Sequence, residues 1–244
     1  GYGFYKQYKD ARTLMEYGNL GVTDSAIEAD LIRRKIMRNH TAGVNLTTSY
    51  QTDNLSLLFG GAWSYYTCPH WGELDWVDGW QNNKIAGRWY DNDVTKHDAN
   101  IFTKVAWQPA EGLNLYADLQ YRIVDYKAWG VNDNFDWNTM QMQPIDVDKQ
   151  YHFLNPHIGL SYEFDSRNSL FISAAIAHKE PTRSDFTDRY MFADDTTQPT
   201  SEMLIDYEAG YNYTSQRLNL GVNLYYMRYK DQLIPTGMVN DSSD

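Results

Sequence analysis

Apolar and polar residues alternate with a period of two along much of the chain, and the pattern is clearest in "RLNLGVNLYYMRYKDQLIP" (217–235). From Leu218 to Tyr226 every second residue is apolar, and the residues between are polar, small or aromatic. A period of two predicts a β-strand with one apolar face. In a soluble protein that face would point inward, whereas in a membrane barrel it would point outward into lipid.

The alternation recurs in seven other segments, which predict further strands. These segments are 40–50, 54–66, 100–107, 113–124, 151–164, 168–178 and 207–214. Residues 24–37 are ambiguous, because they fit either a helix or a loop followed by a strand. The first residues, "GYGFYKQYKD", resemble the end of a strand already under way. We therefore expect an all-β chain, an antiparallel up-and-down meander of about eight or nine strands.

The connections between these segments fall into two classes. Four are tight and rich in Asp, Asn, Ser, Gly or Pro, the residues of short hairpin turns: 51–54, 108–112, 165–168 and 214–217. The others are predicted to be long, at 68–98, 129–150, 181–202 and from 232 onward. In a meander the tight turns then share one end, which is typical of a transmembrane β-barrel rather than a soluble sandwich.

Aromatic residues mark both ends of the predicted strands. Just before the four tight turns, on the apolar face, stand Tyr50, Trp107, Phe164 and Tyr213; near the other ends stand Tyr65, Tyr121 and Tyr226. Such positions suit the aromatic girdles of a membrane barrel. From Leu218 to Tyr226 a strand advances eight residues at about 3.3 Å each. With a tilt of about 40° it spans about 20 Å along the membrane normal, near the expected apolar band of about 25 Å. The alternative is that these rings cap a soluble core.

Composition excludes some functions. The 244 residues suffice for one large β domain, and with a mean hydropathy of −0.63 no apolar run is long enough for a membrane helix. A net charge of −11 argues against nucleic acid as a partner. The lone Cys68 cannot form an internal disulfide. We expect no signal peptide in these residues, and because "VNDSSD" follows the last strand without a closing element, we expect a piece of a longer protein.

The richest group of rings and acids lies in 68–98. Its candidate ligand contacts are the rings of Trp76 and Trp80 and the carboxylates of Asp75 and Asp78. The alternative is that these rings pack the loop against its neighbours. We expect no catalytic residues, because no catalytic or nucleotide-binding motif is present, and no cofactor. We also expect no metal site, because no second pair of soft ligands follows Cys68 and His70.

A polar set of strand residues is predicted to line the barrel interior. It consists of Asn114, Asp118, Gln120, Arg122, Asp206, Glu208, Asn212, Asn219 and Asn223. The apolar set that should share the opposite face consists of Val44, Leu46, Leu115, Leu119, Leu218, Leu220, Val222 and Leu224.

Several segments resemble the β-barrel of TonB-dependent outer-membrane receptors. They are 1–9, 88–105, 113–122, 153–164, 177–186 and 201–237. The last is the most specific, with the strand Tyr-Glu-Ala-Gly-Tyr, a short turn, and an aromatic strand that ends in Tyr-Lys-Asp-Gln. The resemblance covers nearly the whole chain, so residues 1–244 are identified as a partial β-barrel domain.

This resemblance implies the fold, location and partners of the full-length protein. In the family a plug domain fills a barrel of 22 strands in the Gram-negative outer membrane, and TonB energises the uptake of a scarce ligand such as an iron chelate, a cobalamin or a glycan. The plug, the TonB-contacting segment and the remaining strands are absent here. The implied partners are membrane lipid, the plug, TonB and the transported ligand.

Two alternative functions remain at this point. One is a passive outer-membrane porin, and the other is a soluble carbohydrate-binding β protein. Because strands are missing, we also expect two unpaired sheet edges, through which the fragment could pair with a second copy.

Overall fold

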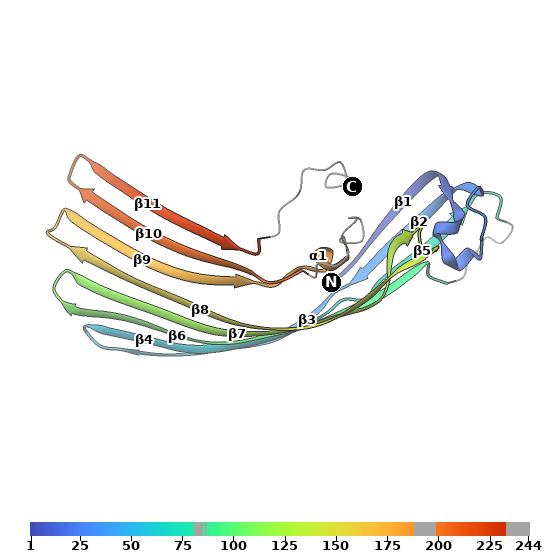
Figure 1. The fold of residues 1–244 in the computed structure, drawn as a ribbon. Coiled ribbons are helices and arrows are strands. Elements are labelled where there is room, and N and C mark those ends of the chain that lie inside the picture. The colour runs from blue at the N-terminus through green and yellow to red at the C-terminus, as the bar shows by residue number, and fades with distance from the viewer. Residues whose placement is uncertain (81–84, 86, 188–198, 233–244) are drawn as a thin grey trace. The chain divides into compact units, whose positions relative to one another are not determined.

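The computed structural model describes residues 1–80, 85, 87–187 and 199–232, and most of the described residues are in antiparallel strands (Figure 1). The strands are β1 (Tyr2–Thr13), β2 (Glu28–Arg38), β3 (His40–Gln51), β4 (Leu55–Thr67), β5 (His70–Val77), β6 (Tyr90–Ala110), β7 (Leu113–Asp136), β8 (Gln141–Glu163), β9 (Asn168–Lys179), β10 (Glu202–Thr214) and β11 (Asn219–Lys230). The short helices are η1 (Leu14–Glu16), η2 (Gly18–Leu20) and α1 (Arg183–Thr187). No helix in the described part of the chain could cross a membrane.

The predicted all-β meander is confirmed. All eight predicted strands are present, as β3, β4 and β6–β11, and the strand expected at residue 1 is β1. The strand order runs β1-β2-β5-β6-β7-β8-β9-β10-β11, and β4 pairs with β3 and β6. Within the described residues β1 and β11 end this order, and β3 pairs only with β4, so the sheet keeps unpaired edges, as expected, and is not closed into a barrel.

Two of the predicted long loops, 68–98 and 129–150, are wrong in extent. β5 and the first part of β6 occupy most of 68–98, which leaves a connection at 78–89. β7 and β8 extend so far that only residues 137–140 join them. Residues 24–37, ambiguous in the sequence, lie mostly in β2. These additional strand residues escaped prediction because they alternate charged and apolar side chains less regularly than the strands near the tight turns.

The chain divides into two compact units, and the longest strands contribute to both. The first unit comprises Gly1–Ala42, Ser64–His97 and Asp125–Lys149, and the second comprises Gly43–Trp63, Asp98–Val124 and Gln150–Asp244.

The first unit has a small hydrophobic core, made by Leu14, Tyr17, Leu20, Leu31, Leu74, Val77, Trp89 and Tyr90. Close packing at Gly72 is part of it, because a Cβ there would come within 2.4 Å of the Trp89 ring. The Trp89 ring meets the rings of Tyr17 and Tyr90 edge to face, with centroids 5.4 and 5.1 Å away. This core anchors the β1–β2 connection against β2 and β5.

The second unit contains all four predicted tight turns, at one end of its strands (Figure 1). Three turns are closed in the same way, by a side-chain oxygen that accepts the backbone N–H three residues later. Thr52 accepts from Leu55 at 3.1 Å, Asp165 from Asn168 at 3.0 Å and Ser215 from Leu218 at 3.1 Å. Short polar residues at these positions therefore fix the hairpins, as the sequence predicts.

The two faces of the strands in the second unit differ in chemistry. Across β8–β11 the residues Leu160, Ile172, Ala209 and Leu224 pair in one row, while Gly159, Ser173, Glu208 and Tyr225 pair in the next. On β7, Tyr116, Asp118 and Gln120 contact His157, Lys104 and Asn155 respectively, so these three residues lie on the polar face and Leu115 and Leu119 on the other. Val44 and Leu46 border the same apolar hollow as Ile101 and Tyr121. The predicted division of faces is confirmed at these positions.

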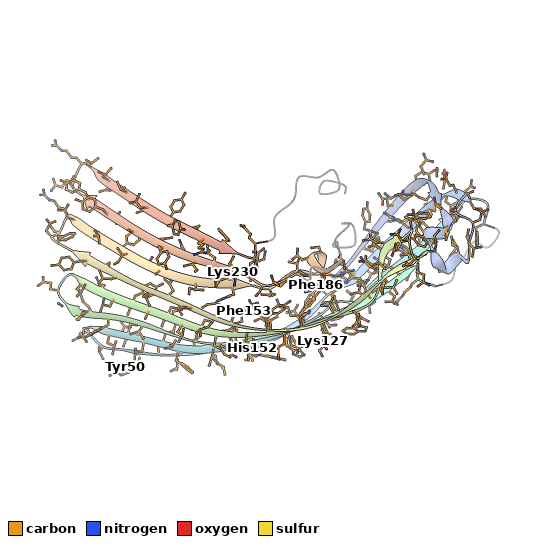
Figure 2. The ribbon with its side chains drawn as sticks, in the orientation of Figure 1. Tyr50, Lys127, His152, Phe153, Phe186 and Lys230 are labelled. Carbon is orange, nitrogen blue, oxygen red and sulfur yellow. The ribbon has the colours of Figure 1, made fainter. Side chains whose placement is uncertain are left out.

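The apolar face is exposed rather than packed into a core. The exposed fraction is 70% for Leu224, 72% for Leu46 and 59% for Ile158. The rings expected before the tight turns include Tyr50, Trp107 and Phe164, which are also exposed, and Figure 2 shows Tyr50 beside the β3–β4 turn. A continuous exposed apolar face of this kind requires a covering partner or a lipid environment.

Candidate ligand-binding surface

A β-bulge in β5 places Asp75 beside Trp76 on one face of the first unit. Trp76 pairs with Ile32 and Leu74 pairs with Arg33, so Asp75 is the extra residue between them. Its carboxylate accepts a hydrogen bond from Arg34 at 2.7 Å and forms an ion pair with Lys6 at 3.0 Å. Without the bulge, consecutive residues would point to opposite faces of the strand.

Three rows of residues cross β1, β2 and β5 on this face. The rows are Tyr8–Ile32–Trp76, then Lys6–Arg34–Glu73, then Phe4–Ile36–Trp71. Aromatic rows therefore flank a charged row. We call the set Phe4, Lys6, Tyr8, Arg34, Asp75 and Trp76 the bulge surface.

The rings of the bulge surface are accessible. Phe4 is 61% exposed, Tyr8 56% and Trp76 41%. Trp71, in the third row, is buried; its Nε1 donates to Glu73 at 2.8 Å, and the Arg88 guanidinium lies 4.4 Å above its ring. A sheet holds exposed rings at fixed spacing, which lowers the entropy lost when a ligand stacks on them.

The positive charges of Lys6 and Arg34 in the middle row are balanced by the carboxylates of Glu73 and Asp75. Lys6 and Arg34 share Asp75, and Arg34 also lies 3.6 Å from Glu73. Partial burial would raise the pKa of Asp75, but hydrogen bonds from Lys6 and Arg34 outweigh it, and the net shift is downward. Asp75 is therefore a carboxylate at neutral pH, and the surface offers both donors and acceptors between its rings.

Two further hydrogen-bonding groups extend the surface at Tyr8. The Tyr8 hydroxyl donates to Asp30, which also accepts from the backbone N–H of Ala11 at 3.0 Å. The hydrogen bond to Asp30 raises the pKa of Tyr8 to about 12. Ala11 has a φ of 43° at a second register irregularity, between Lys9 and Arg12. The Tyr8 ring is thereby held by its hydroxyl.

Of the four candidate contact residues, the structure places Asp75 and Trp76 together on the bulge surface. Asp78 is exposed at the end of β5, and its backbone N–H donates to the Asp30 carbonyl at 2.8 Å. Trp80 packs against the hydrophobic core of the first unit, as in the alternative in which the rings hold the loop. No sequence pattern points to Phe4, Lys6, Tyr8 and Arg34 as contacts, because only the pairing of β2 with β1 and β5 brings them to Asp75.

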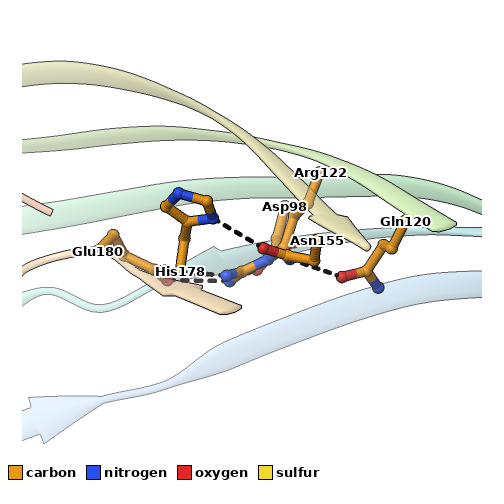
Figure 3. Close-up of polar contacts among 6 residues, drawn as sticks. All are labelled: Asp98, Gln120, Arg122, Asn155, His178 and Glu180. Carbon is orange, nitrogen blue, oxygen red and sulfur yellow. Dashed lines mark hydrogen bonds and ion pairs between the residues drawn. The ribbon is translucent and has the colours of Figure 1, made fainter. Parts of the chain in front are cut away.

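The second unit has a polar network on the face opposite the exposed apolar residues (Figure 3). The Arg122 guanidinium donates to Asp98 at 2.9 Å and to both Glu180 oxygens at 2.9 Å. Beside it, the Asn155 amide nitrogen donates to Gln120 at 3.0 Å, and the Asn155 amide oxygen accepts from His178 Nδ1 at 2.9 Å. Arg122 and Gln120 belong to the set predicted to line the barrel interior.

Metal and catalytic groups are not assembled in the described residues. No group of three or more His, Cys, Asp or Glu side chains there could hold a metal ion. His152 contacts Tyr121 and His157 contacts Tyr116, and since Tyr116 and Tyr121 differ in parity the two histidines face opposite ways. Cys68 is buried and lies beside Asn39 and His70.

An antiparallel meander with tight turns at one end, an exposed apolar face and a polar opposite face has the architecture of a membrane β-barrel wall. The model of the family "TonB dependent receptor-like, beta-barrel" matches residues 1–244, so the chain belongs to this family. This is a family of receptors, which confirms the prediction that the chain is not an enzyme.

Solved structures of similar fold come from outer-membrane receptors and transporters. The copper transporter OprC is 12% identical, with a TM-score of 0.64 over 83% of this chain and 31% of its own. The ferric yersiniabactin uptake receptor FyuA from Yersinia pestis is 11% identical, with a TM-score of 0.58 over 84% and 31%. The iron transporter FrpB from Neisseria meningitidis is 14% identical, with a TM-score of 0.53 over 98% and 34%.

The chain thus spans about a third of the length of these structures. At these identities the likeness concerns the fold. Among proteins with curated descriptions, none matches this chain.

Proposed function

We propose that residues 1–244 form part of the barrel of a TonB-dependent receptor that takes up a scarce ligand across the Gram-negative outer membrane. The observation that carries this proposal is the contrast of faces in the second unit. Leu46, Leu224 and Ile158 are exposed on one face, whereas Arg122 and its two carboxylates lie on the other. In a barrel wall the first face meets lipid and the second meets the interior.

The proposal includes a partner for each of the two faces. Lipid covers the apolar face, and the plug domain of the full-length protein occupies the interior beside the polar face. TonB would act through the plug, outside this chain. A porin would share the apolar face, but the family to which the chain belongs is one of receptors.

We assign ligand contact to the bulge surface, with Trp76 and Tyr8 as stacking rings and Asp75, Lys6 and Arg34 as polar contacts. Exposed rings beside paired charges suit a flat, partly charged ligand, such as a metal chelate, a cobalamin or a glycan. A metal chelate is the first to test, since FyuA and FrpB are named for ferric yersiniabactin and iron. Asp78 and Trp80 remain candidates for the rim of this surface.

The test uses the full-length receptor in a Gram-negative host that lacks its own copy. Uptake of radiolabelled ferric chelates, cobalamin and oligosaccharides is compared with and without TonB. We expect TonB-dependent uptake of one ligand, and recovery of the receptor from membranes only with detergent. Uptake that persists without TonB would favour a porin, and recovery without detergent would favour a soluble protein.

The ligand site is tested separately with the double variant Tyr8→Ala/Trp76→Ala. Loss of two stacked rings, each worth about 1–2 kcal/mol, should weaken binding by roughly 10- to 100-fold. Tyr5→Ala is the matched control, because Tyr5 is also exposed on β1 but pairs with Lys35 in a row that faces the other way. Equal ligand affinity in the double variant and the control would remove the bulge surface from the ligand site.

A further inference from the structure

A hollow of about 730 Å³ interrupts the apolar face of the second unit at Gly61. Its lining includes Leu46, Phe59, Trp63, Ile101 and Tyr121, from β3, β4, β6 and β7. The volume falls within the range of about 300–1,000 Å³ typical of small-molecule pockets. The hollow is therefore large enough for part of an apolar molecule rather than only a surface irregularity.

The absence of a side chain at Gly61 keeps the hollow open. Phe59 and Trp63 lie two residues to either side on β4, so their side chains share its face. A Cβ at position 61 would lie 3.5 Å from Ile101 Cγ2 and 3.0 Å from the Asn100 carbonyl oxygen. Any larger residue would fill the space above β6 that Phe59 and Trp63 border.

The lining selects for hydrocarbon. Apart from Asn100, Thr47 and Thr48, every described residue that borders the hollow is apolar or aromatic, and none is Lys or Arg. Trp63 and Tyr121 each add one polar group to the lining, an indole N–H and a phenol hydroxyl, as is typical of rings at the level of lipid headgroups. A ligand with several phosphates would find no cation among the lining residues, whereas an unbranched acyl chain would contact mainly carbon atoms of the lining.

We propose that this hollow is a site for one acyl chain of a bilayer phospholipid, held against Gly61 more tightly than lipid on the rest of the barrel wall. The inference rests on the proposed function, because it requires this face to meet lipid. Continuity supports it, since the hollow opens within the exposed face that includes Leu46 and Ile101. On most of that face the side chains protrude, so an acyl chain contacts them along one side only. In the hollow the same chain also contacts the side chains that border it.

The experiment measures lipid retained by the full-length receptor. Receptor purified in detergent is titrated with dipalmitoyl phosphatidylethanolamine and examined by native mass spectrometry. We expect one lipid to bind more tightly than the others. Gly61→Leu, which fills the hollow, should weaken that first binding by about tenfold, because contact with several methylene groups is lost.

Two further variants separate the site from folding and from general hydrophobicity. Ala99→Leu fills the hollow from β6, where Ala99 is part of the lining, and should weaken binding of the first lipid as Gly61→Leu does. It therefore tests the site even if Gly61→Leu folds poorly. Ala209→Leu adds the same bulk on the apolar face, in the row of Leu224 and Ile172 but outside the hollow, and should retain the lipid.

Equal lipid binding in all four proteins would overturn the inference. The inference would also be overturned if the receptor were a dimer that Gly61→Leu dissociates without a change in bound lipid, since the hollow would then bind a second copy. Tighter binding of lipopolysaccharide than of the phospholipid would overturn it as well. Failure of the proposed function is distinguishable, because membrane recovery and TonB-dependent uptake are measured on the same variants. A receptor that takes up its ligand but shows no lipid difference overturns only the acyl-chain site.

Discussion

Arg34 Nη2 lies 2.7 Å from the Asp75 carboxylate, on the face where Arg34 pairs with Glu73, beside a bulge that brings Trp76 to the same face. In a regular strand Asp75 would share a face with Glu73, two residues away, and Trp76 would lie opposite. The bulge instead keeps Glu73, Asp75 and Trp76 near one another. Bulges often redirect side chains at functional sites, and this one builds the bulge surface.

Replacing Asp75 by Asn should have a small, pH-dependent effect on stability. Lys6 is half exposed, so loss of the ion pairs should cost about 0.2–1 kcal/mol. Because the folded pKa is depressed, the stabilisation is present above the unfolded value of about 3.9 and is lost as pH falls through the folded pKa. The check is hydrogen exchange of β5 amides in Asp75→Asn and wild type, compared at neutral pH and below pH 4. A difference that grows on acidification would contradict the assignment.

Tyr8 should ionise later than an ordinary tyrosine. Its hydrogen bond to Asp30 raises its pKa to about 12, compared with about 10 in an unfolded chain. Since the folded pKa is the higher one, this contribution to stability is complete below pH 10 and is lost as pH rises from about 10 to 12. The ultraviolet difference between wild type and Tyr8→Phe during a pH titration reports this one group. A midpoint near 10 would show that the Asp30 contact is not formed.

The sequence predicts the second unit better than the first. In the second unit one face is uniformly apolar, and turns such as Asp165–Asn168 need particular short polar residues, so period and turn chemistry locate the strands. In the first unit β5 carries Glu73 and Asp75 between Trp71 and Trp76, and the bulge breaks the period. A pattern search therefore sees a loop where the structure has a strand.

The candidate site shows the same limit. Trp76 and Asp75 could be selected from composition, because rings and acids gather in their segment. Lys6 and Tyr8 could not, since their nearness to Asp75 depends on the pairing of β1 with β2 and β5 between residues far apart in sequence. Only the alternation of Tyr2, Phe4, Lys6 and Tyr8 along β1 was available as a signal that these residues share a face.

The apolar face is tested by Val222→Arg in the full-length receptor. Val222 is 51% exposed, pairs with Tyr211 on β10 and is the middle residue of the apolar run from Leu218 to Tyr226. An Arg near the middle of a bilayer should cost about 2–4 kcal/mol. Asn223→Arg is the control, because Asn223 pairs with Gly210 on the opposite face and should cost much less. Folding into vesicles, followed by urea titration, measures both; a cost below about 1 kcal/mol for Val222→Arg would mean that this residue does not meet lipid.

The polar network is tested at Arg122, which neutralises two carboxylates that come from β6 and from the residue that follows β9. Arg122→Met would leave Asp98 and Glu180 without their shared cation, and both side chains are mostly buried, with exposed fractions of 20% and 14%. Loss of charge-assisted hydrogen bonds should destabilise the barrel wall by about 1.5–3 kcal/mol.

If repulsion between the two carboxylates is the cause, adding Asp98→Asn and Glu180→Gln to Arg122→Met should recover part of that loss. Urea titration of the refolded full-length receptor compares the single and triple variants. A triple variant less stable than Arg122→Met would show instead that the carboxylates have other essential partners, and that Arg122 stabilises the wall through its packing over the Phe153 ring, 5.9 Å away.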